Sequence, residues 1–143
     1  DAKLALAEIR DLARGIHPAV LTDRGLDAAL SSLAARCPVP VALSTDLEPR
    51  PPEPVEAAAY FVVAEALTNV ARHSGAEHAA VSVLREDGSL RVEVRDDGRG
   101  GAELHPDSGL AGLRDRVGAL GGRLELASPP GGPTILTAVI PCA

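Results

Sequence analysis

Four polar residues, Glu65, Asn69, Arg72 and His73, interrupt one of the most apolar stretches of the sequence. Side chains three or four residues apart stack on one face of a helix, so a helix here would present them together. Asparagine carries a small cost in a helix interior, whereas its carboxamide oxygen is a hard ligand suited to Mg²⁺. Glu65 could accept a proton or orient a metal-bound water, and the Arg-His pair could contact phosphate. The pattern predicts a metal and phosphate site; a solvated polar helix face is the plainer alternative.

A second cluster, Asp96 to Gly100, ends a stretch in which apolar and polar residues alternate. A carboxylate at a strand end could accept a hydrogen bond from the exocyclic amine of adenine, where guanine carries a carbonyl instead. Gly98 and Gly100 would let the backbone approach a ring or a phosphate closely. Asp and Gly are also common turn formers, so a simple turn is the alternative. Together with the helix above, this cluster predicts a site for ATP with Mg²⁺.

Two further segments are candidates for the same site. Gly109, Leu110 and Gly112 open a predicted helix, and the unpaired amides of a helix N-terminus bind phosphate readily. Ordinary capping of that helix explains Ser108 equally well. Thr134 follows a Gly-Gly-Pro turn into the last predicted strand. That turn is mainly structural, and we expect the threonine to offer a hydrogen bond into the pocket.

The hydrophobic pattern predicts the elements that must position these residues. An Asp-Gly pair at 87–88 suits a tight hairpin, and Pro54 suits the first turn of the longest helix. The predicted helices cover 2–14, 24–36, 54–73 and 109–120. The predicted strands cover 39–46, 78–86, 89–96, 123–128 and 134–140, with a mobile loop over 97–108.

This order of elements predicts an α/β sandwich of the α+β kind. We expect a mixed sheet of about five strands with about three helices on one face. Two connections look like hairpins, which excludes a doubly wound parallel sheet. In the longest helix, apolar residues recur at steps of four, three and one and should form the buried stripe. They are Val55, Ala59, Val62, Val63, Ala66, Leu67 and Val70.

Composition limits the partners of the chain. Its 143 residues are about one domain in length and can bury a core. Ala, Val and Leu dominate the hydrophobic residues, and Tyr60 and Phe61 are the only aromatic ones, so bases have no aromatic platform for stacking. A formal net charge of −6 repels nucleic acid and anionic membranes. It does not exclude ATP, because a bound Mg²⁺ and nearby Arg residues dominate the local field.

Cysteine usage and hydropathy indicate a cytoplasmic domain. Cys37 and Cys142 lack metal-binding spacing and are interpreted as small buried hydrophobes in a reducing compartment. The sequence has no charged and apolar leader, and no apolar run near the roughly 18 residues that span a bilayer. It begins without Met inside a helical pattern, which indicates a piece of a longer protein. Whether that parent protein is anchored in a membrane stays open.

In order and spacing, the four segments resemble the catalytic ATP-binding domain of sensor histidine kinases, more narrowly the nitrate-sensor and desaturase-sensor type. Residues 65–73 match the N box of that family, 96–100 its first glycine box and 109–116 its second. The resemblance implies the Bergerat ATP-binding fold of the GHKL superfamily. It implies Glu65 near the transferred phosphoryl group, Asn69 on Mg²⁺ and Asp96 on the adenine amine. Arg72 stands where the family usually has Lys, and 101–108 would be a short ATP lid.

The resemblance also implies the domain organisation and the partners. Residues 1–23 would be the end of a dimerisation and phosphoacceptor helix with its hinge, and 24–143 the catalytic domain. The acceptor would lie upstream, because His17 precedes a proline at a predicted helix end, so this chain alone should not phosphorylate itself. The expected partners are the upstream domain of the same protein, a response regulator and a homodimer of the full-length parent.

Two other functions remain open for a chain of this kind. One is an anti-sigma-type serine kinase that acts as a switch on a partner protein. The other is a nucleotide-sensing interaction domain that has lost phosphoryl transfer. The helices that precede the N box and the pattern of 109–116 favour the histidine kinase.

Overall fold

A computed structural model describes residues 19–102 and 109–142 of the chain. The strands and helices predicted from residue 24 onward are present, while the helix predicted over 2–14 lies outside the described residues. The helices are α2 (Ala19–Arg36), α3 (Glu53–Asn69) and α4 (Gly109–Ala119), and a π-helical turn, η1 (Val70–Ser74), follows α3. The strands are β1 (Val41–Asp46), β2 (Ala79–Glu86), β3 (Ser89–Asp96), β4 (Arg123–Ala127) and β5 (Thr134–Pro141).

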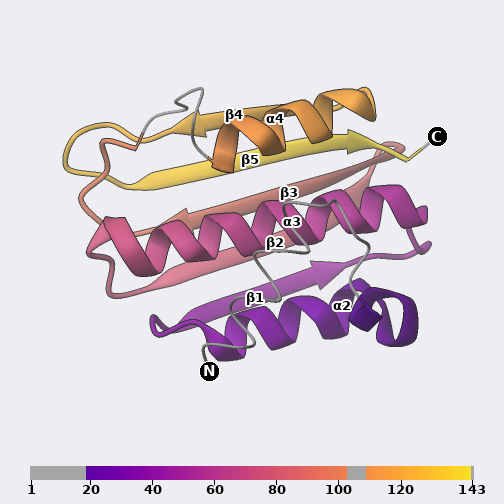
Figure 1. The fold of residues 1–143 in the computed structure, drawn as a ribbon, viewed down its shortest axis with the longest axis horizontal. Coiled ribbons are helices and arrows are strands. Elements are labelled where there is room, and N and C mark those ends of the chain that lie inside the picture. The colour runs from indigo at the N-terminus through magenta and orange to yellow at the C-terminus, as the bar shows by residue number, and fades with distance from the viewer. Residues whose placement is uncertain (1–18, 103–108, 143) are drawn as a thin grey trace.

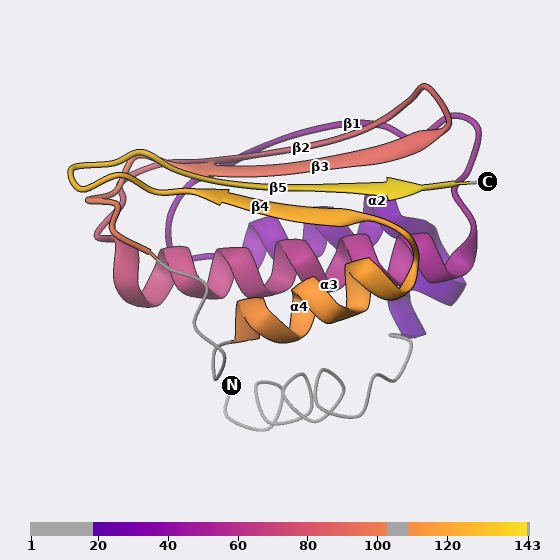
Figure 2. The same cartoon turned by 90° about the horizontal axis from the view of Figure 1, so that it is seen from above.

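The described residues form one sheet and one layer of helices (Figure 1). The strand order is β1-β2-β3-β5-β4, with β1 and β2 parallel and the other neighbours antiparallel. Figure 2 shows α2, α3 and α4 on the same side of this sheet, and no described helix covers its other face. The predicted α/β sandwich with a mixed five-stranded sheet is therefore confirmed.

The hairpin between β2 and β3 has the predicted tight turn. Asp87 and Gly88 have φ angles of 50° and 77°, and positive φ at both central residues is the requirement of a type I′ turn. Glu86 pairs with Ser89 across it. The turn sets the register of β3, and with it the position at which the strand ends in Asp96.

Helix α3 lies in the middle of the helical layer, between α2 and α4 (Figure 1). All seven residues of the predicted stripe are buried. Burial extends around the helix beyond that stripe, because neighbours cover it on three sides. It reaches Glu56, which is 1% exposed and receives two guanidinium nitrogens of Arg50, Nη2 at 3.0 Å and Nε at 3.2 to 3.3 Å. The sequence reasoning had not identified this ion pair.

The core is aliphatic, as the composition predicts, with one aromatic contact at its helical side. Phe61 is 1% exposed, and its ring meets Tyr60 edge to face at 5.6 Å. The guanidinium of Arg116 in α4 lies 4.2 Å from the Phe61 ring centroid. This cation-π contact joins α4 to α3 through Phe61.

Helix α2 has a break at Gly25, where φ is 83° and ψ is 173°. Beyond it, Leu26 and Leu30 are buried in the hydrophobic core. The predicted domain boundary at 23 and 24 falls close to this break and stays a prediction. Cys37 and Cys142 are half-buried free thiols that pack against the core. Among the described helices, none is long and apolar enough to cross a membrane.

Candidate functional site

A small cavity of about 30 Å³ lies between α3, the sheet and α4. Four residues predicted from the sequence line it, and each comes from a different element: Asn69 from α3, Asp96 from β3, Leu110 from α4 and Thr134 from β5. Apolar side chains complete the wall. They are Ala66, Val70, Val94, Ala102, Leu126 and Leu136. The fold thus brings an amide, a carboxylate and a hydroxyl to one apolar cavity.

Asp96 is the most buried acidic group at this cavity, with 5% of its surface exposed. Its Oδ1 accepts a hydrogen bond of 2.8 Å from the Gly98 N–H. Its Oδ2 makes no hydrogen bond to any residue that the structure describes. Burial raises the pKa of this carboxyl, the Gly98 N–H lowers it, and the neighbouring charge of Asp97 raises it. One oxygen is therefore held in place while the other can accept a hydrogen bond from a ligand.

Gly100 follows Asp96 closely and packs against the connection between β4 and β5. A Cβ on Gly100 would overlap the carbonyl oxygen of Pro129, and one on Gly132 would overlap that of Gly98. Gly100 and Gly132 have φ angles of 69° and 78°, which favour glycine. The sequence predicts close approach of a ligand at Gly100 and a mainly structural turn at Gly132. Contact between two backbone segments is the reason that the structure supplies.

Thr134, the first residue of β5, directly follows this connection and is linked to Ala102 through Ser128. Its Oγ1 lies 2.6 Å from Ser128 Oγ, which accepts a hydrogen bond of 3.0 Å from the Ala102 N–H. The Gly101 N–H donates to the Ser128 carbonyl at 2.9 Å. Residues 98–102 are therefore held against the β4–β5 connection, and the threonine hydroxyl has a fixed position at the cavity wall.

Glu65 lies one helical turn before Asn69, at the start of α4 rather than at the cavity lining. The side chain is half-buried, and a Cβ on Gly109 would overlap its carboxylate. Gly109 is the first residue of α4. A carboxylate at a helix N-terminus interacts favourably with the unpaired amides there. The structure thus brings Glu65 and Gly109, two predicted site residues, into contact with each other.

Two other predicted residues stand apart from the cavity. Arg72 is exposed, and Gly112 is exposed with nothing near the position of a Cβ. The side chain of His73 lies outside the described residues. The prediction of an α-helix up to His73 was wrong in its last turn, because the backbone becomes π-helical at Val70. A π-helical turn has more residues per turn than an α-helix, so the angular spacing of the side chains changes after Asn69.

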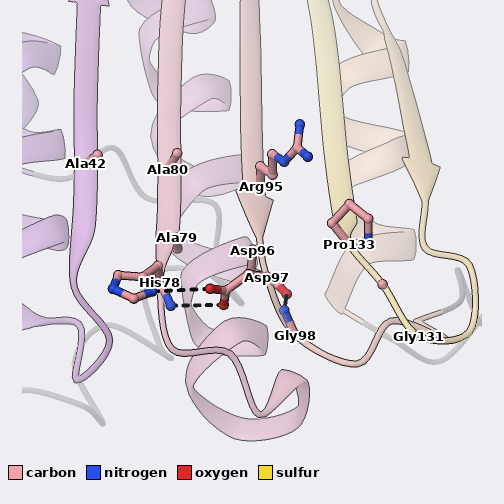
Figure 3. Close-up of a pocket in the computed structure, with 11 residues that line it drawn as sticks. Ala42, His78, Ala79, Ala80, Arg95, Asp96, Asp97, Gly98, Gly131 and Pro133 are labelled. Atoms are coloured by element: carbon pink, nitrogen blue, oxygen red, sulfur yellow. Dashed lines mark hydrogen bonds and ion pairs between the residues drawn. The ribbon is translucent and has the colours of Figure 1, made fainter.

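A larger hollow of about 550 Å³ lies at the same end of the sheet, on the face without helices (Figure 3). Its lining includes Asp96, which it shares with the small cavity, and His78 and Asp97. His78 Nδ1 lies 3.2 Å from Asp97 Oδ2. The sequence analysis did not predict this pair, although the alternation along β3 indicates that adjacent Asp residues at its end face opposite sides of the sheet.

The small cavity, not the larger hollow, fits the predicted chemistry. No residue of α3 or α4 lines the larger hollow, so it lacks Asn69, Leu110 and the predicted phosphate-binding helix. The small cavity combines a buried carboxylate with an amide oxygen and a helix N-terminus beside it. These groups suit an amine, a divalent cation and phosphate respectively.

Comparisons with known proteins agree with this arrangement. Residues 55–143 match the model of the histidine kinase-, DNA gyrase B- and HSP90-like ATPase family. The chain is 32% identical to sensor histidine kinase MctS of Rhizobium johnstonii, over 96% of this chain and 32% of that protein. It is 35% identical to sensor histidine kinase NarS of Mycobacterium tuberculosis, over 90% of this chain and 32% of that protein.

A solved structure shows the same arrangement of elements. The blue-light activated histidine kinase of Erythrobacter litoralis EL346 superposes with a TM-score of 0.65 and 27% identity. The match covers 82% of this chain and 41% of that one. The chain thus spans about a third of the length of the two curated relatives and under half of the solved structure.

Proposed function

The chain belongs to the histidine kinase-, DNA gyrase B- and HSP90-like ATPase family, as an ATP-binding catalytic domain of the sensor histidine kinase kind. On this basis we propose that it transfers the γ-phosphoryl group of ATP to a histidine on an upstream dimerisation domain. The family match and the five-stranded sheet confirm the resemblance and the Bergerat fold predicted from the sequence. The transfer reaction and the roles of single residues are proposals.

The observation that carries this proposal is the meeting of Asn69, Asp96 and Thr134 at one cavity. Asp96 is proposed to accept the adenine amine on Oδ2, because Oδ1 already holds the Gly98 N–H. The apolar wall suits the faces of the purine ring. Thr134, fixed by Ser128, adds a hydrogen bond at the same end.

Asn69 is proposed as the protein ligand of Mg²⁺. The residues present fit this ion, since a carboxamide oxygen is a hard ligand and Mg²⁺ takes only one or two protein oxygens beside phosphate and water. When bound, Mg²⁺ neutralises charge on the phosphate oxygens during transfer. The N-terminus of α4, at Gly109 and Leu110, is proposed to bind phosphate through its backbone amides. Arg72, His73 and Gly112 are proposed as outer contacts of the phosphates.

In the proposed reaction an imidazole nitrogen of the acceptor histidine attacks the γ-phosphorus. The new bond joins nitrogen to phosphorus, the bond from phosphorus to the β,γ-bridging oxygen breaks, and ADP leaves. Glu65 is proposed to accept a proton or to orient a water near the phosphoryl group. Positioning and charge neutralisation supply most of the rate, because loose phosphoryl transfer needs little covalent assistance. We also propose a response regulator as the next acceptor, and a cytoplasmic location.

Nucleotide entry requires the cavity to widen. Its volume of about 30 Å³ is close to the share of one water molecule, whereas small-molecule sites span roughly 300 to 1,000 Å³. Leu110 and Ala102 line it from either side of residues 103–108. We propose that these two residues separate when ATP binds, and that α4 carries Leu110 with it.

Calorimetric titration with Mg-ATP tests the binding step. Asn69→Ala should lower the Mg²⁺-dependent part of the affinity. Thr68→Ala is the matched control, because that side chain is exposed on the same helix and its hydroxyl donates to Ala64 O at 2.9 Å. Absence of binding to the unaltered chain, or an unchanged metal dependence in Asn69→Ala, would contradict the assignment.

A transfer assay with the parent protein's dimerisation domain, supplied separately, tests the reaction. Labelled phosphate should appear on a histidine of that domain and not on this chain alone. ATP binding without phosphohistidine would favour the nucleotide-sensing module. Phosphoserine on a partner would favour the anti-sigma-type kinase. The named relatives, all sensor histidine kinases, favour the first result.

A further inference from the structure

Asp97, next to the proposed adenine-binding aspartate, ties the end of β3 to the beginning of β2. Its Oδ1 accepts hydrogen bonds from the backbone N–H groups of Glu77 at 2.8 Å and His78 at 3.0 Å. Its Oδ2 lies 3.2 Å from His78 Nδ1 (Figure 3). The Asp97 N–H donates to the His78 carbonyl at 3.2 Å. Four contacts therefore join one residue after β3 to two residues before β2.

The segment that Asp97 holds is the link from the Asn69 helix into the sheet. The π-helical turn η1 ends at Ser74, Gly75 takes the left-handed conformation with φ of 64°, and β2 begins at Ala79. Glu77 and His78 are the last residues of this link. The backbone thus runs from the end of the Asn69 helix to Glu77 and His78, and hydrogen bonds join these two residues to Asp97, which follows Asp96.

The two adjacent aspartates face opposite sides of the sheet, because side chains alternate along a strand. Asp96 is buried on the helix side, while the Asp97 side chain is half exposed on the side without helices. We infer that Asp97 is a positioning residue for nucleotide selection, which holds the β3 end so that Asp96 meets the adenine amine. This inference rests on the proposed function and assigns to Asp97 no contact with ATP.

The carboxyl of Asp97 is held in the ionised form, in which its oxygens accept hydrogen bonds. The backbone N–H groups of His78 and Glu77, with the His78 ring, lower the pKa of the Asp97 carboxyl against a smaller effect of burial. It therefore stays an ionised acceptor at neutral pH. The positioning role of Asp97 depends on its hydrogen bonds and not on its charge, because the charge only raises the pKa of Asp96.

The test compares ATP with inosine triphosphate, which carries a carbonyl where ATP carries the amine. In Asp97→Ala, the affinity for ATP should fall about tenfold and that for inosine triphosphate less than about threefold, because a hydrogen bond to a charged group is lost only from ATP. A merely structural role would lower both affinities by the same factor. Glu77→Ala is the matched control, since it removes a neighbouring negative charge and keeps the N–H group that Asp97 binds.

Asp97→Asn should restore the ATP preference to within about threefold of the unaltered chain, because the amide oxygen can accept the same backbone N–H groups. If Asp97→Ala is unfolded at the assay temperature, Asp97→Ser makes the same comparison, since the serine Oγ lies one bond closer to the backbone than Asp97 Oδ1, the oxygen that accepts both N–H groups. If the unaltered chain binds ATP and the alanine or serine variant keeps the same preference for ATP over inosine triphosphate, this inference alone is overturned. No binding of either nucleotide to the unaltered chain overturns the proposed function and this inference with it.

Discussion

Gly109 at the start of α4 lies directly against the carboxylate of Glu65 in α3, in the space that a side chain at position 109 would need. The contact joins two of the proposed boxes, one carrying the expected catalytic carboxylate and the other the expected phosphate-binding amides. The absence of a side chain at Gly109 therefore leaves the space that the Glu65 carboxylate occupies. A glycine in a nucleotide-binding motif can serve the fold and the ligand together.

Gly109→Ala should destabilise the chain by about 0.5 to 1.5 kcal/mol, because the Glu65 carboxylate, the far end of a flexible side chain, has to turn aside. In a Glu65→Ala background that cost should fall, because the overlapping carboxylate is gone. Gly118→Ala is the control: the position is exposed in the same helix with nothing near a Cβ, and alanine there should stabilise by about 0.5 to 1 kcal/mol. Urea denaturation of the unaltered chain, the single variants Gly109→Ala and Glu65→Ala and the double variant closes a double-mutant cycle. Equal costs in both backgrounds would show that Glu65 is not the obstacle.

Gly100→Ala should destabilise the chain more than Gly101→Ala. Both glycines have positive φ, 69° and 80°, so alanine at either pays about 1 to 2 kcal/mol for the left-handed conformation. Only at Gly100 would the Cβ overlap a backbone atom, the Pro129 carbonyl oxygen. The difference between their free energies of unfolding isolates the packing term, expected at about 1 to 3 kcal/mol. Equal values would mean that the two backbone segments separate at little cost.

Asp96→Asn should weaken ATP binding while leaving the chain without nucleotide as stable as before, or more so, at pH 7. Burial raises the pKa of the Asp96 carboxyl in the folded state, so its ionised form opposes folding. The unaltered chain should therefore lose stability as pH rises from the ordinary aspartate pKa of 3.8 through the raised folded value. The asparagine variant lacks this loss. Urea denaturation from pH 3 to pH 8 measures it, and a large loss of stability in Asp96→Asn would mark the carboxylate as structural.

Arg116→Ala should destabilise the chain by about 1 kcal/mol through loss of the cation-π contact with Phe61. Burial lowers the pKa of the Arg116 guanidinium, in keeping with a partly desolvated charge. Arg114→Ala, an exposed arginine on the same helix, should change the free energy of unfolding by less than about 0.5 kcal/mol. If the two variants have the same free energy of unfolding, the contact between Arg116 and the Phe61 ring does not stabilise the packing of α4 on α3.

Much of the fold was predictable because its signals are local. Alternation along β3 and helical spacing along α3 depend on neighbours within a few residues, and the turn at Asp87 and Gly88 requires only a tolerance of positive φ. The π-helical turn at Val70 was missed because nothing in residue type marks it. The pair of Glu56 and Arg50 was missed since burial of an acid depends on what packs over it.

The sequence by itself determined the order of helices and strands, the strand end at Asp96 and the helical position of Asn69, because periodicity and turn chemistry act over short distances. Only the tertiary structure decided which of those residues meet. It turned Asp96 to the cavity and Asp97 to His78, set Glu65 on Gly109, and assigned Gly100 to a backbone crossing. Such contacts join residues far apart in the chain, and their geometry depends on how whole elements pack rather than on any local pattern.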